Sequence, residues 1–253
     1  MCECARPRLS IVIPAYNESE RLPTTLKAID EYVTASGETT EIIVAEDGSE
    51  DNTLSVARAF VSRDASYHVL PLPHRGKAAA VRSGILMARG EHVLFTDADL
   101  STPIEYASRL VRALDDGADV AIGSREGAGA TRVSEPGYRH VMGRAFNLMV
   151  RLVAVPGIDD TQCGFKAFRR DVAADLFGRA RLHVGGGVVR GARVTGFDVE
   201  ILHLARRRGY TVAQIPVFWE HVSGSKVHPL RDSFRMATDV ARVRLNAMLG
   251  RYD

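Results

Sequence analysis

Two aspartates, Asp97 and Asp99, stand one residue apart just beyond the apolar run 92–95, with Thr96 between the run and Asp97. Pro103 follows, and proline suits the first turn of a helix. In an open α/β sheet, side chains that leave the carboxyl end of a buried strand lie where such sheets bind ligands. Two carboxylates there predict a site for a hard divalent cation that also contacts substrate phosphates. The alternative interpretation is a polar strand end with a helix cap, because Asp-x-Asp pairs are common.

Polar side chains also follow other apolar runs in the first half of the chain. They come after residues 9–13, 41–45 and 119–123, and they are Tyr16, Glu18, Asp47, Ser124 and Arg125. A nucleotide with a metal-bound diphosphate needs such groups, because a carboxylate accepts hydrogen bonds from a base or ribose and an acidic pair holds the metal. The sequence lacks the glycine patterns of dinucleotide-binding and P-loop proteins, which disfavours both of those phosphate sites.

Strand-like and helix-like patterns alternate from residue 9 to residue 123. Apolar runs predict buried strands at 9–13, 41–45, 67–70, 92–95 and 119–123. Helical spacing between these runs predicts four helices. The first is capped by Asn17 and ends at Gly37, and the second is capped by Ser49 or Asp51 and runs to about Val61. The third begins near Lys77 and ends at Gly90, and the fourth runs from Pro103 to about Leu114. This alternation predicts a doubly wound α/β fold with a mostly parallel sheet.

The pattern changes after residue 123. The segment 136–156 is amphipathic and basic, which is typical either of a helix in a membrane interface or of a core helix with a solvated basic side. The glycine- and arginine-rich segment 178–196 predicts a loop, with a lid as one interpretation. A helix at 197–209, a strand at 211–218 and an arginine-rich amphipathic helix at 231–251 are expected to follow.

Composition sets further limits. The chain has 253 residues, 45% of them hydrophobic and 25% charged, which suits a globular domain with a substantial core. Its net charge of +2 argues against wrapping of nucleic acid. Three scattered cysteines form no disulfide framework and favour a reducing compartment. We find neither a signal peptide nor an apolar stretch of about 18 residues, and so expect no spanning helix.

Eight short motifs of this sequence identify a family resemblance. They are Ile13–Glu18, Asp47–Ser49, Arg75–Lys77, Thr96–Pro103, Gly123–Arg125, Asp160–Lys166, Phe197–Glu200 and Gly224–Lys226. In this order they resemble the inverting family 2 glycosyltransferases of GT-A fold. The form Thr161–Lys166 looks most like that of the dolichyl-phosphate glucose synthases, with the polyprenyl-phosphate mannose synthases close behind.

The resemblance implies roles for individual residues. Donor-binding positions would be Pro14, Tyr16, Glu18, Asp47, Lys77, Asp97, Asp160 and Gln162. Asp99 would hold a Mg²⁺ or Mn²⁺ ion on the donor diphosphate, and Ser101 stands where mannose synthases tend to carry a second ligand. The catalytic group would comprise Asp97, Asp99, Asp198, Arg125 and Lys166, the last two as candidates for the acceptor phosphate or the diphosphate.

The function expected from the resemblance is metal-assisted transfer of glucose from UDP-glucose to a dolichyl or polyprenyl phosphate. The alternatives are mannose transfer from GDP-mannose, a soluble acceptor, or a non-catalytic, membrane-associated binding module. We expect one GT-A domain over 1–253, with a nucleotide-sugar-binding half at 9–125 and an acceptor-binding half at 126–253. No nucleic acid is expected as a partner. The missing spanning segment suggests a cytoplasmic protein, peripheral on the cytoplasmic face of a membrane.

Overall fold

The computed structural model describes residues 6–62, 64, 66–133, 150, 153–183, 187–189, 191, 195–222 and 229–252. Much of the predicted amphipathic segment 136–156, part of the loop 178–196 and the motif 224–226 lie outside these residues. None of the helices in the described part of the chain is both long and apolar enough to cross a membrane.

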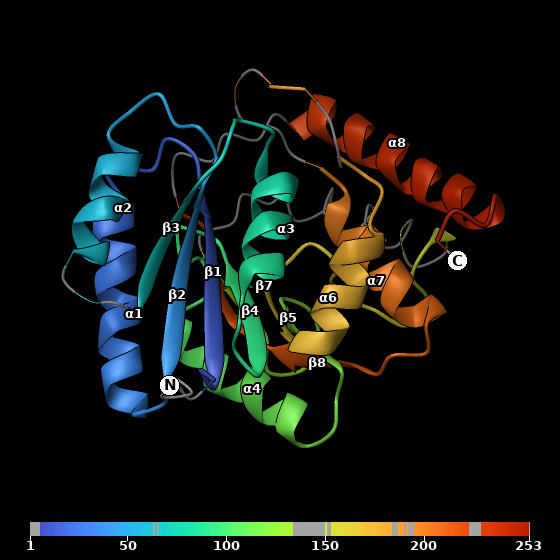
Figure 1. Cartoon of the computed structure of the whole chain (residues 1–253). Helices are drawn as coiled ribbons and strands as arrows, with labels where there is room; N and C mark the ends of the chain where they lie inside the picture. The colour runs from blue at the N-terminus through green and yellow to red at the C-terminus, as the bar shows by residue number, and fades with distance from the viewer. Residues whose placement is uncertain are drawn as a thin grey trace.

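A seven-stranded sheet forms the centre of the described structure (Figure 1). Its strands, in spatial order, are β3 (Tyr67–Pro71), β2 (Thr40–Glu46), β1 (Leu9–Ala15), β4 (His92–Thr96), β7 (Phe165–Arg169), β5 (Val120–Ser124) and β8 (Val212–Pro216). All neighbouring pairs are parallel except those of β7, which runs antiparallel to both β4 and β5. The expected mostly parallel α/β sheet is therefore confirmed.

Helices cover both faces of the sheet because alternate residues of a buried strand point to opposite sides. One hydrophobic cluster joins Val12 and Phe95 to helices α3 (Lys77–Met87), α6 (Arg170–Arg179), α7 (Phe197–Arg207) and α8 (Pro229–Met248). The other joins Ile11 and Leu94 to α1 (Leu22–Ser36), α2 (Thr53–Val61), the 3₁₀ turn η1 (Ile104–Tyr106) and α4 (Ala107–Asp115). Figure 1 shows α3, α6 and α7 on one side of the sheet.

Several element boundaries differ from those predicted. Asn17 does not cap α1, which begins at Leu22; its side-chain oxygen instead accepts a hydrogen bond of 2.8 Å from the amide of Glu50. Gly37 does end α1, in a left-handed conformation with φ of 65°. The first turn after Pro103 is a 3₁₀ turn, and α4 starts only at Ala107.

The carboxyl-terminal half also departs from expectation. The strand expected at 211–218 divides into β8 and a separate strand β9 (Phe218–Glu220). β9 pairs in parallel with β6 (Thr131–Val133), which was not predicted. β7 and α6 were not predicted either, although β7 decides what lies beside Asp97, because its Phe165 pairs with Thr96 in the ladder.

Candidate active site

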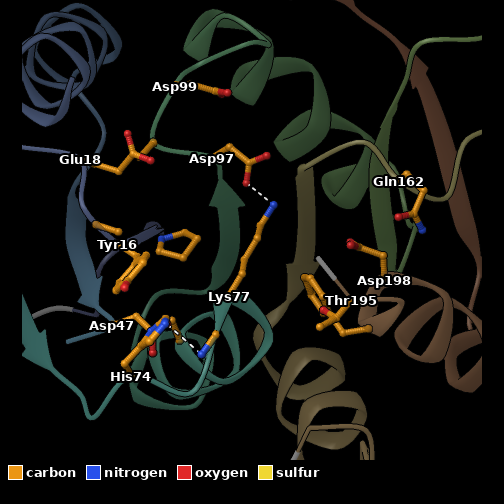
Figure 2. A pocket seen from close by; sticks show the side chains of 16 residues that line it. Tyr16, Glu18, Asp47, His74, Lys77, Asp97, Asp99, Gln162, Thr195 and Asp198 are labelled. Atoms are coloured by element: carbon orange, nitrogen blue, oxygen red, sulfur yellow. Dashed lines mark hydrogen bonds and ion pairs between the residues drawn. The ribbon is translucent and has the colours of Figure 1, made fainter. Parts of the chain in front are cut away.

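A cavity of about 300 Å³ lies at the carboxyl ends of β1, β2 and β4. Parallel strands end at the same edge of a sheet, so the loops that follow them converge there. Figure 2 shows Lys77 pointing across the cavity, with one group of side chains on either side of it. The first group is Tyr16, Asp47 and His74, and the second is Gln162, Thr195 and Asp198.

Lys77 and Asp97 form an ion pair inside this cavity. Lys77 is the first residue of α3, and its Nζ lies 2.5 Å from Oδ1 of Asp97, which follows β4. Desolvation lowers the pKa of Lys77, but nearby carboxylates, first Asp97 and then Asp198, outweigh it and raise the pKa above its ordinary value. The cavity therefore holds an ammonium group that is charged at neutral pH beside acidic side chains.

Gly164 leaves room for the Asp97 carboxylate. It directly precedes β7, the antiparallel neighbour of β4. A Cβ atom on Gly164 would lie 2.2 Å from Oδ2 of Asp97, far inside contact distance. A side chain at this position would therefore force the Asp97 carboxylate out of its place.

Asp99 lies on the same loop at the rim of the cavity. Its Oδ1 accepts a hydrogen bond of 3.0 Å from the amide of Ser101, and the intervening Leu100 is left-handed with φ of 44°. Non-glycine residues rarely adopt this conformation, and when they do it is often at functional sites. The loop is held further by the carbonyl of Ser101, which accepts a 2.8 Å hydrogen bond from the amide of Glu220.

The acidic side chains suit a metal ion that is shared with a ligand. In the described part of the chain, no three His, Cys, Asp or Glu side chains come together as a self-sufficient metal site. Mg²⁺ in particular is usually held by one or two carboxylates together with water and substrate phosphates. Asp97 and Asp99, both on the cavity wall, provide hard oxygen donors of this kind. The residues present therefore fit such an ion.

Asp47 organises the other side of the cavity. It is buried, and it accepts hydrogen bonds from the amides of Arg75 (2.9 Å) and Gly76 (2.8 Å). Its Oδ2 also lies 2.8 Å from Nδ1 of His74. The His74 ring stacks on Tyr16 with 3.8 Å between ring centroids and an interplanar angle of 2°. These contacts tie the loop after β3 to the loops after β1 and β2.

The loop after β1 is fastened through its backbone. The amide of Asn17 donates to Oγ of Ser49 (3.0 Å), and the amide of Glu18 donates to Oγ1 of Thr53 (2.8 Å). Asn17 itself is left-handed with φ of 53°. The hydroxyl groups that follow β2 thus hold Tyr16 and Glu18 at the cavity.

Two ion pairs lie behind the second group. Lys166 is 1% exposed, and its Nζ donates to Oδ1 of Asp198 (2.6 Å) and to the carbonyl of Cys163 (2.5 Å). Arg125 donates to both oxygens of the fully buried Asp160, at 2.7 and 2.9 Å. Burial raises the pKa of Asp160, but the Arg125 guanidinium outweighs it and holds that pKa well below its usual range.

Comparison with known proteins assigns this arrangement to a family. The sequence pattern of glycosyl transferase family 2 matches residues 10–177, from β1 to α6. The chain belongs to family 2 of the glycosyltransferases. This family 2 enzyme is similar to proteins named dolichyl-phosphate beta-glucosyltransferase from Drosophila melanogaster (36% identity), Dictyostelium discoideum (32%) and Homo sapiens (33%). Each match covers 96% of this chain and 75–76% of the relative.

Solved structures confirm that the family 2 enzyme has the GT-A fold. A mannosyl-3-phosphoglycerate synthase from Rubrobacter xylanophilus matches with a TM-score of 0.66 and 19% identity, covering 98% of this chain and 76% of that one. A Pyrobaculum calidifontis mannosyltransferase, determined with GDP-Man and Mn²⁺, matches with a TM-score of 0.61 and 22% identity. There the alignment covers 97% of this chain and 65%, just under two thirds, of the other.

Most residues predicted for the site of the family 2 enzyme meet in the one cavity. Its wall includes Pro14, Tyr16, Glu18, Asp47, Lys77, Asp97, Asp99, Gln162 and Asp198. Ser101, Arg125, Asp160 and Lys166 are not among its lining residues, and the last three are engaged in the ion pairs behind it. The roles assigned to all of these residues stay predictions.

Sequence reasoning missed other lining residues of the enzyme. His74, Gly76, Ala80, Thr195 and Phe197 also line the cavity. His74 directly precedes the motif Arg75–Lys77, so its position was the available signal. Thr195 belongs to the glycine- and arginine-rich segment, for which a lid was one interpretation, but no individual residue of that segment was predicted to line the cavity.

Proposed function

We propose that this enzyme transfers glucose from UDP-glucose to a dolichyl or polyprenyl phosphate and inverts the anomeric centre. The observation that carries the acceptor and the sugar is the similarity, at 32–36% identity over 96% of the chain, to proteins named for them. UDP as the nucleotide of the donor is what the family resemblance implies. The inversion is the behaviour expected from the resemblance to inverting family 2 enzymes. The geometry of the cavity supports the same reaction, as follows.

The donor would lie across the cavity. Tyr16, Asp47 and His74 form a rigid, partly aromatic side that suits the nucleoside. Lys77, at the centre, suits the diphosphate because its ammonium group offers positive charge where the leaving group gains negative charge. Gln162 and Asp198, on the opposite side, would face the sugar.

The divalent ion belongs to the proposal as well. Asp99 would hold Mg²⁺ or Mn²⁺ together with the donor diphosphate, Asp97 would lie beside them, and the Ser101 hydroxyl is the proposed second ligand. When bound, such an ion stabilises the charge that develops on the departing diphosphate. Lys77 adds to this stabilisation and keeps the Asp97 carboxylate oriented.

The acceptor needs little chemical activation. The second pKa of a phosphate monoester is about 6, so the attacking oxygen is largely ionised at neutral pH without a strong base. The residues must instead position it in line with the leaving group. Lys166 holds Asp198 on the cavity wall for this, and Arg125 holds Asp160, which accepts a hydrogen bond of 3.1 Å from the amide of the lining residue Gln162. In this proposal the two cations act by fixing the wall of the cavity, and direct contact of Arg125 or Lys166 with a phosphate is a separate prediction.

A dolichyl or polyprenyl phosphate is anchored in a bilayer by its hydrocarbon chain. The enzyme would therefore work at a membrane surface, and we assign it to the cytoplasmic face because nucleotide sugars and a reducing compartment are found there. The described helices include no spanning segment, so this contact would be peripheral for the part of the chain that is described.

Transfer of radiolabelled sugar to a detergent-dispersed polyprenyl phosphate tests the proposal. UDP-glucose and GDP-mannose are compared as donors, each with Mg²⁺, with Mn²⁺ and with EDTA. Asp99→Asn is assayed beside Asp116→Asn, which changes an exposed carboxylate at the end of α4. We expect transfer from UDP-glucose that depends on the metal ion. Asp99→Asn should abolish this transfer, and Asp116→Asn should leave it unchanged.

Each other result has a defined meaning. Preference for GDP-mannose would change the proposed donor from UDP-glucose to GDP-mannose and leave the proposed acceptor unchanged. Transfer only to an acceptor that carries no prenyl phosphate would remove the lipid phosphate from the proposal. Donor binding without transfer to any acceptor would contradict the proposed reaction and favour a binding module.

A further inference from the structure

Helix α8 has apolar side chains on two faces. The inner face packs into the core through Val240 (2% exposed) and Val243 (0% exposed). The other face carries Phe234, Leu245 and Met248, which are 73%, 53% and 78% exposed. A surface helix of a globular protein ordinarily has polar residues on the side away from the core. The outward face of α8 therefore departs from the usual pattern.

The three exposed side chains form one stripe along the helix. Leu245 comes 11 residues after Phe234 and 3 before Met248, and at about 100° per residue the three lie within about 60° of one another. We call Phe234, Leu245 and Met248 the outer stripe. The exposed residue Ala241 lies in the same sector, so the stripe continues for about 20 Å.

Basic side chains flank the outer stripe on both sides. Around the helix axis, Arg242 lies about 60° from Leu245 in one direction, and Arg244 lies about 100° from Leu245 in the other direction. Both are exposed, Arg242 to 62%. Between residues 234 and 248 the one acidic side chain, Asp239, is 3% exposed. The outward side of α8 is thus apolar in the middle and positive at both edges.

We infer that the outer stripe is an interfacial membrane site that lies flat on an anionic bilayer. An interfacial helix buries an apolar face at the boundary of headgroups and acyl chains while flanking arginines contact anionic lipids. A second copy of this chain fits the same face poorly, because it would bring arginines against arginines without exposed carboxylates between them. This inference rests on the proposed function, which places the acceptor phosphate in a membrane.

α8 is connected to the candidate active site. Asp239 accepts a hydrogen bond of 3.0 Å from the amide of Gly196, the residue before α7. α7 carries Asp198 on the cavity wall. In Figure 1, α8 runs along the upper right of the molecule. A bilayer against the outer stripe would therefore lie against the helix that packs on α7, which carries Asp198 of the cavity wall.

Flotation with vesicles tests the inference on the full chain. Vesicles of phosphatidylcholine are compared with vesicles that also contain phosphatidylglycerol. Leu245→Asp and Arg244→Glu change the surface, and Leu86→Asp makes the matched change at a 42% exposed leucine of α3. We expect binding to the anionic vesicles only, reduced about tenfold or more by Leu245→Asp, about fivefold by Arg244→Glu, and unchanged by Leu86→Asp.

Transfer assays separate this inference from the proposed function. Leu245→Asp should keep full activity on a short, water-soluble prenyl phosphate and lose it on a long-chain polyprenyl phosphate embedded in vesicles. Wild-type transfer to the short acceptor without vesicle binding would overturn the membrane site and leave the proposed function intact. Vesicle binding through the stripe without transfer to any lipid phosphate would support the site and overturn the function. A dimer in light scattering that Leu245→Asp dissociates, without vesicle binding, would assign the stripe to a second copy.

Discussion

Nδ1 of His74 lies 2.8 Å from Oδ2 of Asp47, and this contact joins two loops of the candidate active site. On its other side, Nε2 of His74 lies 3.1 Å from the carbonyl oxygen of Gly191, and the amide of Val189 donates to the His74 carbonyl (2.9 Å). His74 therefore connects the proposed nucleoside side of the cavity with part of the glycine- and arginine-rich segment.

Replacing His74 should weaken donor binding more than catalysis. His74→Ala removes the stacking partner of Tyr16 and one hydrogen bond to Asp47, whose two amide bonds remain. A hydrogen bond to a charged group contributes about 1.5 kcal/mol or more, so we expect the Kd for UDP to rise about tenfold. Isothermal titration calorimetry measures this Kd. In transfer assays we expect kcat to change less than KM. An unchanged Kd would show that His74 does not position the nucleoside side.

Gly164→Ala should reduce activity without unfolding the protein. The new methyl group would lie 2.2 Å from Oδ2 of Asp97, so the carboxylate must move out of its place. We expect kcat to fall at least about tenfold, since small displacements in an active site are costly. Gly178→Ala is the matched control, because a Cβ atom there meets nothing within 4 Å. Equal activity of the two variants would contradict this interpretation.

Lys77→Met should lower the rate of transfer. The change removes the ammonium group 2.5 Å from Asp97 while keeping much of the apolar stem. Loss of one preorganised charge-stabilising group typically costs about a hundredfold in kcat, and we expect that magnitude here. Lys27→Met, at a lysine that is 76% exposed on α1, is the control. The prediction is wrong if both variants keep wild-type kcat.

Lys166→Met should destabilise the fold. Lys166 is buried beside Asp198, and removing it leaves a nearly buried carboxylate without this partner. Breaking a buried pair in this way costs about 3–5 kcal/mol, which urea denaturation would show. The double variant Lys166→Met with Asp198→Asn should recover part of the loss, because no charge is then left unpaired. A double variant less stable than the single one would argue against the pair as the cause.

Asp160 should contribute stability that depends on pH. Arg125 holds the pKa of Asp160 well below its usual range, so the unfolded chain binds a proton more readily than the native protein does. The contribution is therefore present above the ordinary pKa of about 3.9 and is lost as the pH falls below it. We expect Asp160→Asn to cost about 3–5 kcal/mol at pH 7.

The difference in unfolding free energy between Asp160→Asn and the wild type should become smaller as the pH is lowered from 7 to about 3. Urea denaturation at several pH values across this range measures it. Asp116→Asn, at an exposed aspartate, provides the comparison. A difference that stays constant with pH would mean that Arg125 does not act on Asp160 through its charge.

Local pattern was sufficient for one half of the candidate active site. The alternation of apolar runs and helical spacing predicted β1, β2, β4 and β5, and the ends of parallel strands meet at one edge. That rule alone brings Tyr16, Asp47 and Asp97 together, and they do line one cavity. Lys77 followed from the predicted start of α3.

The other half was decided by tertiary structure. β7 is a short strand whose sequence, Phe-Lys-Ala-Phe-Arg, specifies neither its direction nor its register, and only its insertion between β4 and β5 places Gly164 against Asp97. The family resemblance implied Lys166 as a candidate phosphate ligand, and only its position in that buried strand shows that it pairs with Asp198. His74 reaches the cavity through loop packing, which no periodic pattern records. Sequence alone determined which strand ends carry charge, and long-range strand pairing determined which of those charges face the cavity.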